Sequence, residues 1–257
     1  MSGEKFDLCA QVKASLLELM QTMSSTGKIQ LPSEKRLADQ LQVSRGTIRT
    51  VLATLESEGR IFRRHGSGTY LNLRAAEVNT TLYPHMYFSE LIEQSGYLPS
   101  VRILDVSLEQ EAKIAERLGL PPDQKVVCVR KLYLADGKMC VYCKDFFDQD
   151  LFPMDKLLSL KTEPVSTFQF FDKFTDLSVS WNMLRLDVTD TIQTPELANY
   201  AAVSEHTVKP YLCIEAVTYD QQSRPMFFGY AFVDTGMIDL YLIKHHMGDG
   251  KTAASPL

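Results

Sequence analysis

The chain has 257 residues, 45% of them hydrophobic, so it is long enough for two domains and apolar enough to give each a core. It has no run of 18 apolar residues and its first seven residues are mostly polar, which predicts neither a membrane-spanning helix nor a secretory leader. Residues 1–74 carry 11 Lys+Arg and 7 Asp+Glu (net +4) and the remainder carries 16 and 25 (net −9), which favours local contact with nucleic acid over general adhesion to it.

Two helices are predicted before residue 42. Apolar residues recur at helical spacing from Phe6 to Met23, which predicts a first helix that packs across the next two. Ser33 and Glu34 favour the start of a second helix that ends near Leu41, because a serine can cap the first turn and a carboxylate stabilises it.

A third helix and a β-hairpin follow. Ser44 is a suitable N-cap, and Gly59 is the residue type that ends a helix in the left-handed conformation. The apolar residues between them fall on one helical face. These residues are Ile48, Val51, Leu52 and Leu55. Residues 60–64 and 69–73 suit two short strands around His65-Gly66-Ser67-Gly68, a turn whose glycines allow close approach to a partner.

A helix, a turn, a capped second helix and a basic hairpin in this order are typical of a winged helix-turn-helix that binds double-stranded DNA. The N-terminal end of the second helix of such a motif reaches base edges in the major groove. Two arginines on a helix, or one Gly-Ser-Gly turn, would alone more often belong to an ordinary solvated surface, so the order and lengths of the elements carry this hypothesis. The candidate DNA-contacting residues are Lys35, Arg36, Ser44, Arg45, Thr47, Arg49, His65 and Gly66.

Residues 31–71 resemble the GntR-type winged helix nearly from end to end. The matching motifs include Leu31-Pro32-Ser33-Glu34, Val43-Ser44-Arg45, Thr47-Ile48-Arg49 and Gly66-Ser67-Gly68-Thr69. The resemblance implies that Lys35, Arg45 and Arg49 read DNA, with Gly66 at the tip of the wing. Relatives often carry a polar residue at position 46, so Gly46 removes one possible contact.

The remainder predicts an α+β domain with an antiparallel sheet. Residues 75–86 have no helical period and contain a proline, so we expect a linker there, followed by a domain over 87–247 and a flexible tail over 248–257. Helices are predicted at 88–94, 109–119, 166–174 and 195–202. Strands are predicted at 101–108, 126–135, 139–147, 178–188, 211–219, 225–234 and 239–243.

This order resembles the UTRA effector domain of the HutC branch of GntR-type regulators, over most of 87–243. The matching pieces include Phe88-Ser89-Glu90, the Ala-Glu-Arg-Leu-Gly-Leu-Pro run at 115–121 and the Leu134-Ala135-Asp136-Gly137 turn. The resemblance implies a chorismate-lyase-like fold that forms the dimer and binds a small metabolite beside its sheet.

The positions that bind ligand in relatives depart from the family pattern. Sugar-phosphate-binding relatives have Arg-x-Arg before the turn, where this chain has Lys131 and Tyr133, and they have glutamates where this chain has Cys143 and, after Pro225, a run of apolar residues. Since one ammonium suits a phosphate less well than two guanidinium groups, we expect an anionic or carboxylate group on an apolar body. The alternative is that the aromatic side chains at these positions belong to the hydrophobic core and do not contact a ligand. The effector residues that the resemblance implies are Ser89, Lys131, Tyr133, Cys143, Ser166, Phe227 and Tyr230.

Two further points concern the 126–147 hairpin. A two-residue and a three-residue loop give this hairpin different registers. Lys131 and Cys143 could therefore lie on the same face of the sheet or on opposite faces. Cys140 and Cys143 form a CxxC pattern, but residues three apart in a strand face opposite sides, which favours plain strand packing over a metal site or a disulfide. The histidines show no metal-ligand spacing, and no cofactor is expected.

The sequence therefore predicts a ligand-responsive transcriptional regulator, most simply a repressor, that binds a palindromic operator as a homodimer in the cytoplasm. The alternative is an enzyme of chorismate-lyase-like fold in which DNA binding serves as targeting. No nucleophile elbow, glycine-rich phosphate loop or metal-ligand spacing supports that alternative. A non-specific architectural DNA protein fits poorly with the acidic C-terminal part.

Overall fold

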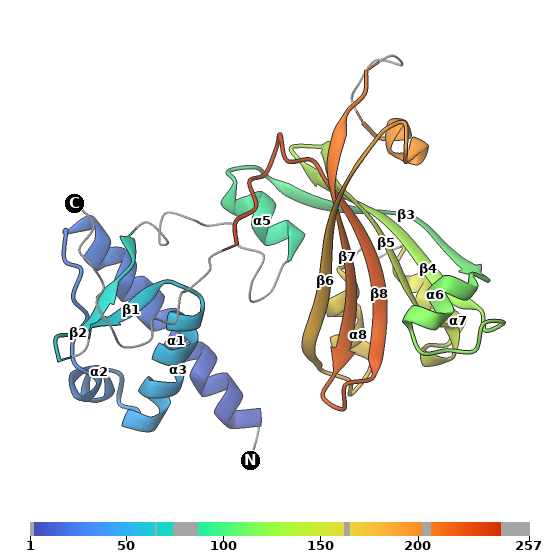
Figure 1. The fold of residues 1–257 in the computed structure, drawn as a ribbon. Helices are drawn as coiled ribbons and strands as arrows, with labels where there is room; N and C mark the ends of the chain where they lie inside the picture. The colour runs from blue at the N-terminus through green and yellow to red at the C-terminus, as the bar shows by residue number, and fades with distance from the viewer. Residues whose placement is uncertain (1–2, 65, 74–86, 162–164, 202–206, 243–257) are drawn as a thin grey trace. The chain divides into compact units, whose positions relative to one another are not determined.

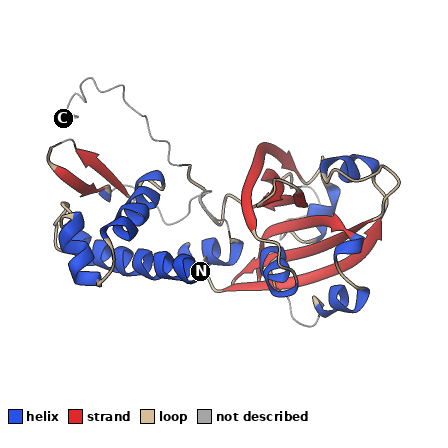
Figure 2. Cartoon of the chain, turned by 90° about the horizontal axis from the view of Figure 1, so that it is seen from below, coloured by secondary structure: helices blue, strands red, loops and turns tan. Residues whose placement is uncertain are grey.

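The computed structural model describes residues 3–64, 66–73, 87–161, 165–201 and 207–242 (Figures 1 and 2). The chain divides into two compact units, residues 1–85 with 241–257 and residues 86–240, each taken by itself below. The predicted linker (75–86) and the predicted tail (248–257) lie outside the described residues. The combination of a helical N-terminal unit with an antiparallel sheet confirms the predicted α+β class.

The first unit is built on three helices around one apolar core. They are α1 (Gly3–Ser25), α2 (Glu34–Leu41) and α3 (Arg45–Ser57). Both α1 and α2 contact α3, as the apolar periodicity predicts. The apolar face of α3 is fully buried because the other two helices cover it. The side chains at the centre of this core are Leu16, Leu37, Ile48, Val51, Leu52 and Leu55.

The turn between α2 and α3 has a fixed geometry. Gln42 adopts the left-handed conformation with φ of 53°, which ends α2, and Ser44 then caps α3 by accepting a hydrogen bond from the Thr47 N–H at 3.0 Å. Gly59, with φ of 74°, ends the turn that follows α3. These local interactions fix how the N-terminal end of α3 is presented.

The hairpin that follows α3 is a short antiparallel pair. Strand β1 (Ile61–Arg64) pairs with β2 (Gly68–Leu71), with Ile61 opposite Leu71. An isolated bridge between Gln30 and Tyr70 adds a third segment beside the pair. Since Ile61 and Leu71 are buried in the helical core, the base of the hairpin is anchored and its tip is exposed.

The second unit is built on a six-stranded antiparallel sheet with the order β3-β4-β5-β8-β7-β6. Two consecutive hairpins, β4–β5 and β7–β8, meet through β5 and β8 at the centre, which leaves β3 and β6 at the edges. The strands are β3 (Pro99–Glu109), β4 (Val126–Ala135), β5 (Lys138–Asp148), β6 (Val179–Asp190), β7 (Pro210–Asp220) and β8 (Pro225–Val233).

Helices cover both faces of this sheet. One face, called the α8 face here, carries Val127 and Val129 and packs against α5, α7 and α8. The opposite face, called the α6 face, carries Cys128 and Leu132 and packs against α6 and η2. The helical segments are α5 (Phe88–Gln94), α6 (Ala112–Arg117), η1 (Gln149–Leu151), α7 (Met154–Ser159), α8 (Thr167–Phe174) and η2 (Pro195–Asn199).

The structure corrects several sequence-based boundaries. The strand predicted at 239–243 is wrong, since within its described part only Tyr241 makes a bridge. The chain leaves the sheet at Asp234, whose carboxylate accepts the Gly236 N–H at 3.0 Å and so stabilises a turn. The helix predicted at 109–119 is shorter because β3 runs on to Glu109, and the one predicted at 195–202 is a 3₁₀ segment. Helix α7 was not predicted.

Gly229 is required by a close contact at the centre of the sheet. It lies directly opposite Asp145 in the β5–β8 register, and a Cβ atom built on it would be 2.6 Å from the Asp145 Oδ1. No real Cβ tolerates that distance, so a side chain here would push the Asp145 carboxylate from its place.

We predict that Gly229→Ala lowers the free energy of unfolding by about 1–3 kcal/mol through overpacking, measured by urea denaturation. The matched control is Gly46→Ala in α3, where the nearest atom to the new Cβ is the Ser44 Oγ at 3.5 Å. That variant should be neutral or stabilise by about 0.4–1 kcal/mol. Equal stability of the Gly229→Ala variant and the wild type would show that Asp145 moves freely.

Candidate DNA-binding surface and effector site

The N-terminal end of α3 presents one unpaired arginine beside a pair of linked hydroxyls. The Ser44 and Thr47 hydroxyl oxygens are 2.8 Å apart and bonded to each other. Arg45 is exposed and has no hydrogen-bond or ion-pair partner in the described part of the chain. A Cβ atom built on Gly46 would meet only the Ser44 Oγ, at 3.5 Å, so the helix surface is open at this position.

Arg49 is held by an ion pair that joins α3 to α2. Its Nε lies 2.8 Å from the Glu34 Oε2, while 63% of the arginine side chain remains exposed. Arg49 is one of the DNA-contacting residues predicted from sequence, whereas its restraint by Glu34 was not predicted. Lys35 and Arg36, next along α2, are exposed and make no side-chain ion pair with any described residue. Cations from both helices are therefore presented on the surface of the first unit.

The wing presents Arg64 on an aromatic platform. The rings of Phe62 and Tyr70 stack with centroids 5.8 Å apart, and the Arg64 guanidinium lies 5.4 Å and 5.0 Å from them. The Tyr70 hydroxyl lies 2.5 Å from the Ser67 Oγ, and the Gln30 side chain donates to the Ser67 carbonyl at 2.8 Å. The basic character of the wing was predicted from sequence, but this aromatic platform, which the pairing of Phe62 with Tyr70 creates, was not.

Two predicted wing residues have different outcomes. Gly66 adopts φ of 71°, a conformation that favours glycine at the tip of the turn. His65 lies outside the described residues. The arrangement as a whole can place cations against phosphates from two helices and the hairpin, while Arg45 projects from a helix end that fits the major groove.

The register of the β4–β5 hairpin decides the question that its loop left open. Lys131 lies directly opposite Cys143, so both are on the α8 face, and Tyr133, two residues further along β4, shares that face. Phe227 also lies there, packed against Phe171 of α8 with ring centroids 5.4 Å apart. These predicted effector residues are thus brought to one side of the sheet.

Tyr230 is not brought together with the others. It lies opposite Lys144 in the register and contacts Phe146 and Phe228, all on the α6 face. An effector that contacts Lys131 could not also contact Tyr230, because the sheet separates them.

Lys131 belongs to a buried polar cluster under α8. Its Nζ lies 2.5 Å from the Asp145 Oδ2 and donates to the Thr167 hydroxyl, also at 2.5 Å. The same hydroxyl donates to Asp145 at 2.5 Å. Thr167 is the first residue of α8, and Ser166 before it forms a capping box with Gln169. The cluster therefore fixes the start of α8 on the sheet, and sequence analysis missed both Asp145 and Thr167.

Burial and the neighbouring Asp145 together set the pKa values in this cluster. Burial by itself lowers the pKa of Lys131, but the neighbouring Asp145 carboxylate outweighs it and raises that pKa. Burial raises the pKa of the Tyr133 phenol and of the Cys143 thiol. At neutral pH Lys131 is thus an ammonium, with a neutral phenol and a neutral thiol around it.

The remaining predicted residues adjoin this cluster. Ser89 is half-buried in the first turn of α5, whose neighbouring Phe88 packs on Tyr133 with ring centroids 5.3 Å apart. Ser166 is buried and engaged as the cap of α8. Six of the seven predicted effector residues therefore lie on or against the α8 face.

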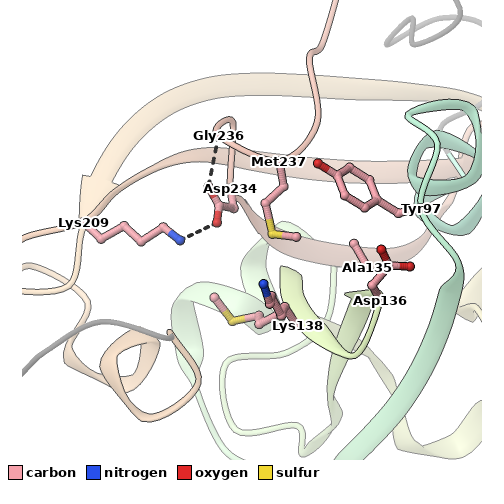
Figure 3. Close-up of a pocket in the computed structure, with 9 residues that line it drawn as sticks. Tyr97, Ala135, Asp136, Lys138, Lys209, Asp234, Gly236 and Met237 are labelled. Carbon is pink, nitrogen blue, oxygen red and sulfur yellow. Dashed lines mark hydrogen bonds and ion pairs between the residues drawn. The ribbon is translucent and has the colours of Figure 1, made fainter.

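A separate cavity of about 410 Å³ lies beside the β4–β5 turn (Figure 3). Tyr97, Lys138 and Met237 point toward it, and the ion pair of Lys209 with Asp234 borders it. None of its lining residues is among the predicted effector residues. Only the Asp136-Gly137 turn beside this cavity was predicted from sequence; the cavity itself was not.

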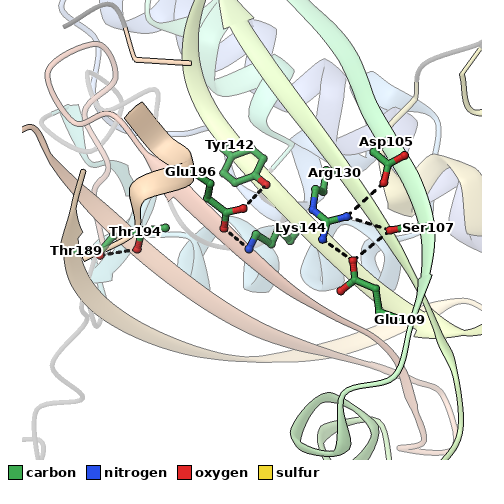
Figure 4. Close-up of polar contacts among 9 residues, drawn as sticks. All are labelled: Asp105, Ser107, Glu109, Arg130, Tyr142, Lys144, Thr189, Thr194 and Glu196. Carbon is green, nitrogen blue, oxygen red and sulfur yellow. Dashed lines mark hydrogen bonds and ion pairs between the residues drawn. The ribbon is translucent and has the colours of Figure 1, made fainter. Parts of the chain in front are cut away.

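The α6 face carries a network of ion pairs (Figure 4). Arg130 contacts Glu109 and Asp105, and Lys144, its register partner, pairs with Glu196, which also accepts the Tyr142 hydroxyl at 3.1 Å. The acidic partners offset the repulsion between two cations that lie side by side on adjacent strands.

Two further findings concern the described residues only. They contain no group of three or more His, Cys, Asp or Glu side chains that could hold a metal ion, and the cysteines among them, including Cys140 and Cys143, are free. No helix among them is long and apolar enough to span a membrane.

Comparison with known proteins is consistent with both units. Residues 8–71 match the family model described as bacterial regulatory proteins, gntR family, and residues 94–233 match the model of the UTRA domain. The transcriptional repressor NagR of Bacillus subtilis (strain 168) is 24% identical over 241 residues, which cover 90% of this chain and 93% of that protein. The probable fructoselysine utilization operon transcriptional repressor of Escherichia coli (strain K12) is 23% identical over 237 residues, covering 91% and 93%.

The fold has a solved counterpart. The crystal structure of the possible transcriptional regulator YydK from Bacillus subtilis subsp. subtilis str. 168 superposes with a TM-score of 0.70 at 17% identity and covers 92% of this chain and 99% of that one. This likeness shows that the two chains share a fold.

We predict that Lys131→Met alone lowers the free energy of unfolding of the second unit by about 3–5 kcal/mol, because it leaves the Asp145 carboxylate buried without its cation. The double variant Lys131→Met with Asp145→Leu should recover most of that loss, since it removes both charges. Urea denaturation of the wild type, both single variants and the double variant gives the coupling. Additive losses would mean that the two side chains do not stabilise each other.

Proposed function

Because the chain belongs to the GntR family of regulators that carry a UTRA domain, we propose that it is a repressor that binds a palindromic operator as a homodimer and responds to a small-molecule effector. The family and the relatives are transcriptional regulators rather than enzymes, so the chain is a DNA-binding regulator and not an enzyme. The repressor assignment is supported by the names of two relatives, each called a repressor. A repressor that binds chromosomal operator DNA in a bacterium would act in the cytoplasm.

The observation that carries the DNA-binding proposal is the exposed, unpaired Arg45 at the capped start of α3. In this proposal Arg45 pairs with a guanine edge in the major groove, while Lys35, Arg36 and Arg49 contact phosphates. Arg64 on its aromatic platform, with Gly66 at the tip, approaches the adjacent groove. The Ser44 and Thr47 hydroxyls share one hydrogen bond, so one of the two keeps a free proton that it can donate to a phosphate or to water.

The effector proposal rests on the cluster under α8. The Thr167 hydroxyl accepts from Lys131 and donates to Asp145, which a ligand hydroxyl could do in its place. Since Asp145 neutralises Lys131, the cluster has no excess positive charge for a phosphate or a carboxylate. We therefore favour a neutral, hydroxyl-bearing effector with an apolar body over the anion expected from the sequence. Tyr133, Cys143, Phe227, Ser89 and Ser166 would surround it.

A palindromic site suits a two-fold protein because each copy of α3 can then read one half-site. One winged helix offers few base contacts, so the second copy supplies the rest of the affinity. This is the physical reason for joining homodimer and palindrome in one proposal.

We predict that Arg45→Ala weakens binding to the operator by about 1–3 kcal/mol per half-site and relaxes preference at one base pair of each half-site. Fluorescence anisotropy at several salt concentrations measures this, with the operator taken from random-sequence selection on the wild type. Arg102→Ala, which removes an exposed arginine from the second unit, is the matched control and should bind as the wild type does. If Arg45→Ala bound the operator with the affinity and selectivity of the wild type, Arg45 would not be part of the DNA interface.

We predict that neutral hydroxylated metabolites, and not their phosphorylated counterparts, raise the melting temperature of the full chain and change its operator affinity. A ligand at 100 times its Kd contributes about 2.7 kcal/mol of stability, which a thermal-shift assay resolves. Matched pairs of a compound and its phosphate serve as internal controls. Selective stabilisation by the phosphorylated members would contradict the neutral cluster as the effector site.

A further inference from the structure

The edge strand β6 exposes apolar side chains on both of its faces. Within the described residues it pairs only with β7, and its outer edge is bare. Trp181, Met183, Leu184, Leu186 and Val188 are 44%, 51%, 38%, 49% and 67% exposed. The strand has neither a lysine nor a proline, the residues that commonly protect a free edge from pairing. A twelve-residue edge of this kind is a template for another strand.

We propose that β6 pairs antiparallel with β6 of a second copy of this chain about a two-fold axis at Leu186, which joins the two sheets into one. The inference rests on the proposed homodimer and specifies how it forms. In this register Leu186 lies opposite itself, Leu184 lies opposite Val188 of the second copy, and Arg185 lies opposite Asp187 of the second copy. A two-fold axis makes each of the last two pairs occur twice.

The pairing is self-complementary on the α8 face. Leu184, Leu186 and Val188 share this face, because they lie opposite Ala216, Ile214 and Leu212 of β7. Each of the three would meet an apolar residue of the second copy. Three of the five exposed apolar side chains of β6 would thus form cross-strand pairs, and such pairs stabilise a sheet.

The pairing is also self-complementary on the α6 face. Arg185 and Asp187 lie there, 61% and 52% exposed as side chains, with their charged groups 2.9 Å apart in the single chain. Across the axis each would face its opposite charge. Arg185 also lies 3.2 Å from Glu215, which holds the guanidinium at the edge.

The same register extends a row of polar residues that already crosses the sheet. Register partners on the α6 face run from one edge strand to the other as Asp105, Arg130, Lys144, Tyr230, Glu215 and Arg185. Figure 4 shows the first three of these side chains with their ion pairs. Asp187 of the second copy would be the next residue in this row, and its negative charge would lie opposite the positive charge of Arg185.

Neighbouring registers lack this match. An axis at Arg185 or at Asp187 would place like charges opposite each other, which is destabilising. An axis at Leu184 would place Leu186 opposite Asn182, and an axis at Val188 would place Leu186 opposite Asp190. Only the axis at Leu186 pairs all three apolar residues and both charges.

Cysteine cross-linking of the full chain tests the register. In a Cys9→Ser background, which removes the one described cysteine that is not buried, Leu186→Cys should form a disulfide-linked dimer under mild oxidation. Val188→Cys is the matched control on the same face. Its copies would be four residues apart along the strands, about 13 Å at roughly 3.3 Å per residue, too far for a disulfide. We expect at least about tenfold faster cross-linking of Leu186→Cys.

Charge exchange tests the same pairing without cross-linking. Arg185→Asp and Asp187→Arg should each weaken self-association by about tenfold, because each places like charges across the axis twice. A mixture of the two variants should associate as well as the wild type, since both cross-axis pairs then have opposite charges. Sedimentation velocity of each variant, the mixture and the wild type measures this.

The outcomes separate this inference from the proposed function. A monomeric wild type at micromolar concentration would overturn both the homodimer and its β6 interface. A dimeric wild type with equal cross-linking of Leu186→Cys and Val188→Cys, or with no recovery in the mixture, would overturn the β6 interface while the homodimer stands.

Discussion

The alternation of side chains along β4 and β5 is the constraint on which the second unit depends. Because Lys131 lies opposite Cys143, every other residue of 126–133 and 141–148 falls on the α8 face and the residues between them fall on the α6 face. If both strands of the hairpin were shifted by one residue relative to the rest of the domain, Lys131 and Asp145 would lie on the opposite face, and Arg130 and Lys144 would lie beneath α8. The buried cluster on one face and the half-buried polar row on the other are therefore two consequences of one register.

The contact between Asp145 and Gly229 extends this constraint to the neighbouring strand. The carboxylate occupies space that any side chain at position 229 would need, so β8 must offer a glycine where it passes Asp145. From there Asp145 reaches both Lys131 and the first residue of α8. The placement of α8 on the sheet thus depends on a buried ion pair, a glycine and a capped helix start together.

The DNA-binding surface is organised differently, by local interactions. The Ser44 cap, the left-handed Gln42 and the pair of Arg49 with Glu34 fix the start of α3 relative to α2. Aromatic stacking does the same for Arg64 on the wing. Side chains that are already ordered lose less conformational entropy when they bind, so such restraints favour a surface used for specific contacts.

The sequence by itself determined the elements whose cause is local. Helices at 34–41 and 45–57, the turn between them and the strand at 126–135 follow from caps, glycines and apolar periodicity, which act over a few residues. Only the tertiary structure decided that Asp145 neutralises Lys131, that Tyr230 faces away from Phe227, and that the chain leaves the sheet at Asp234 instead of forming a further strand at 239–243. These features depend on strand register and on partners distant in the chain, such as Thr167, 36 residues from Lys131, which no local pattern encodes.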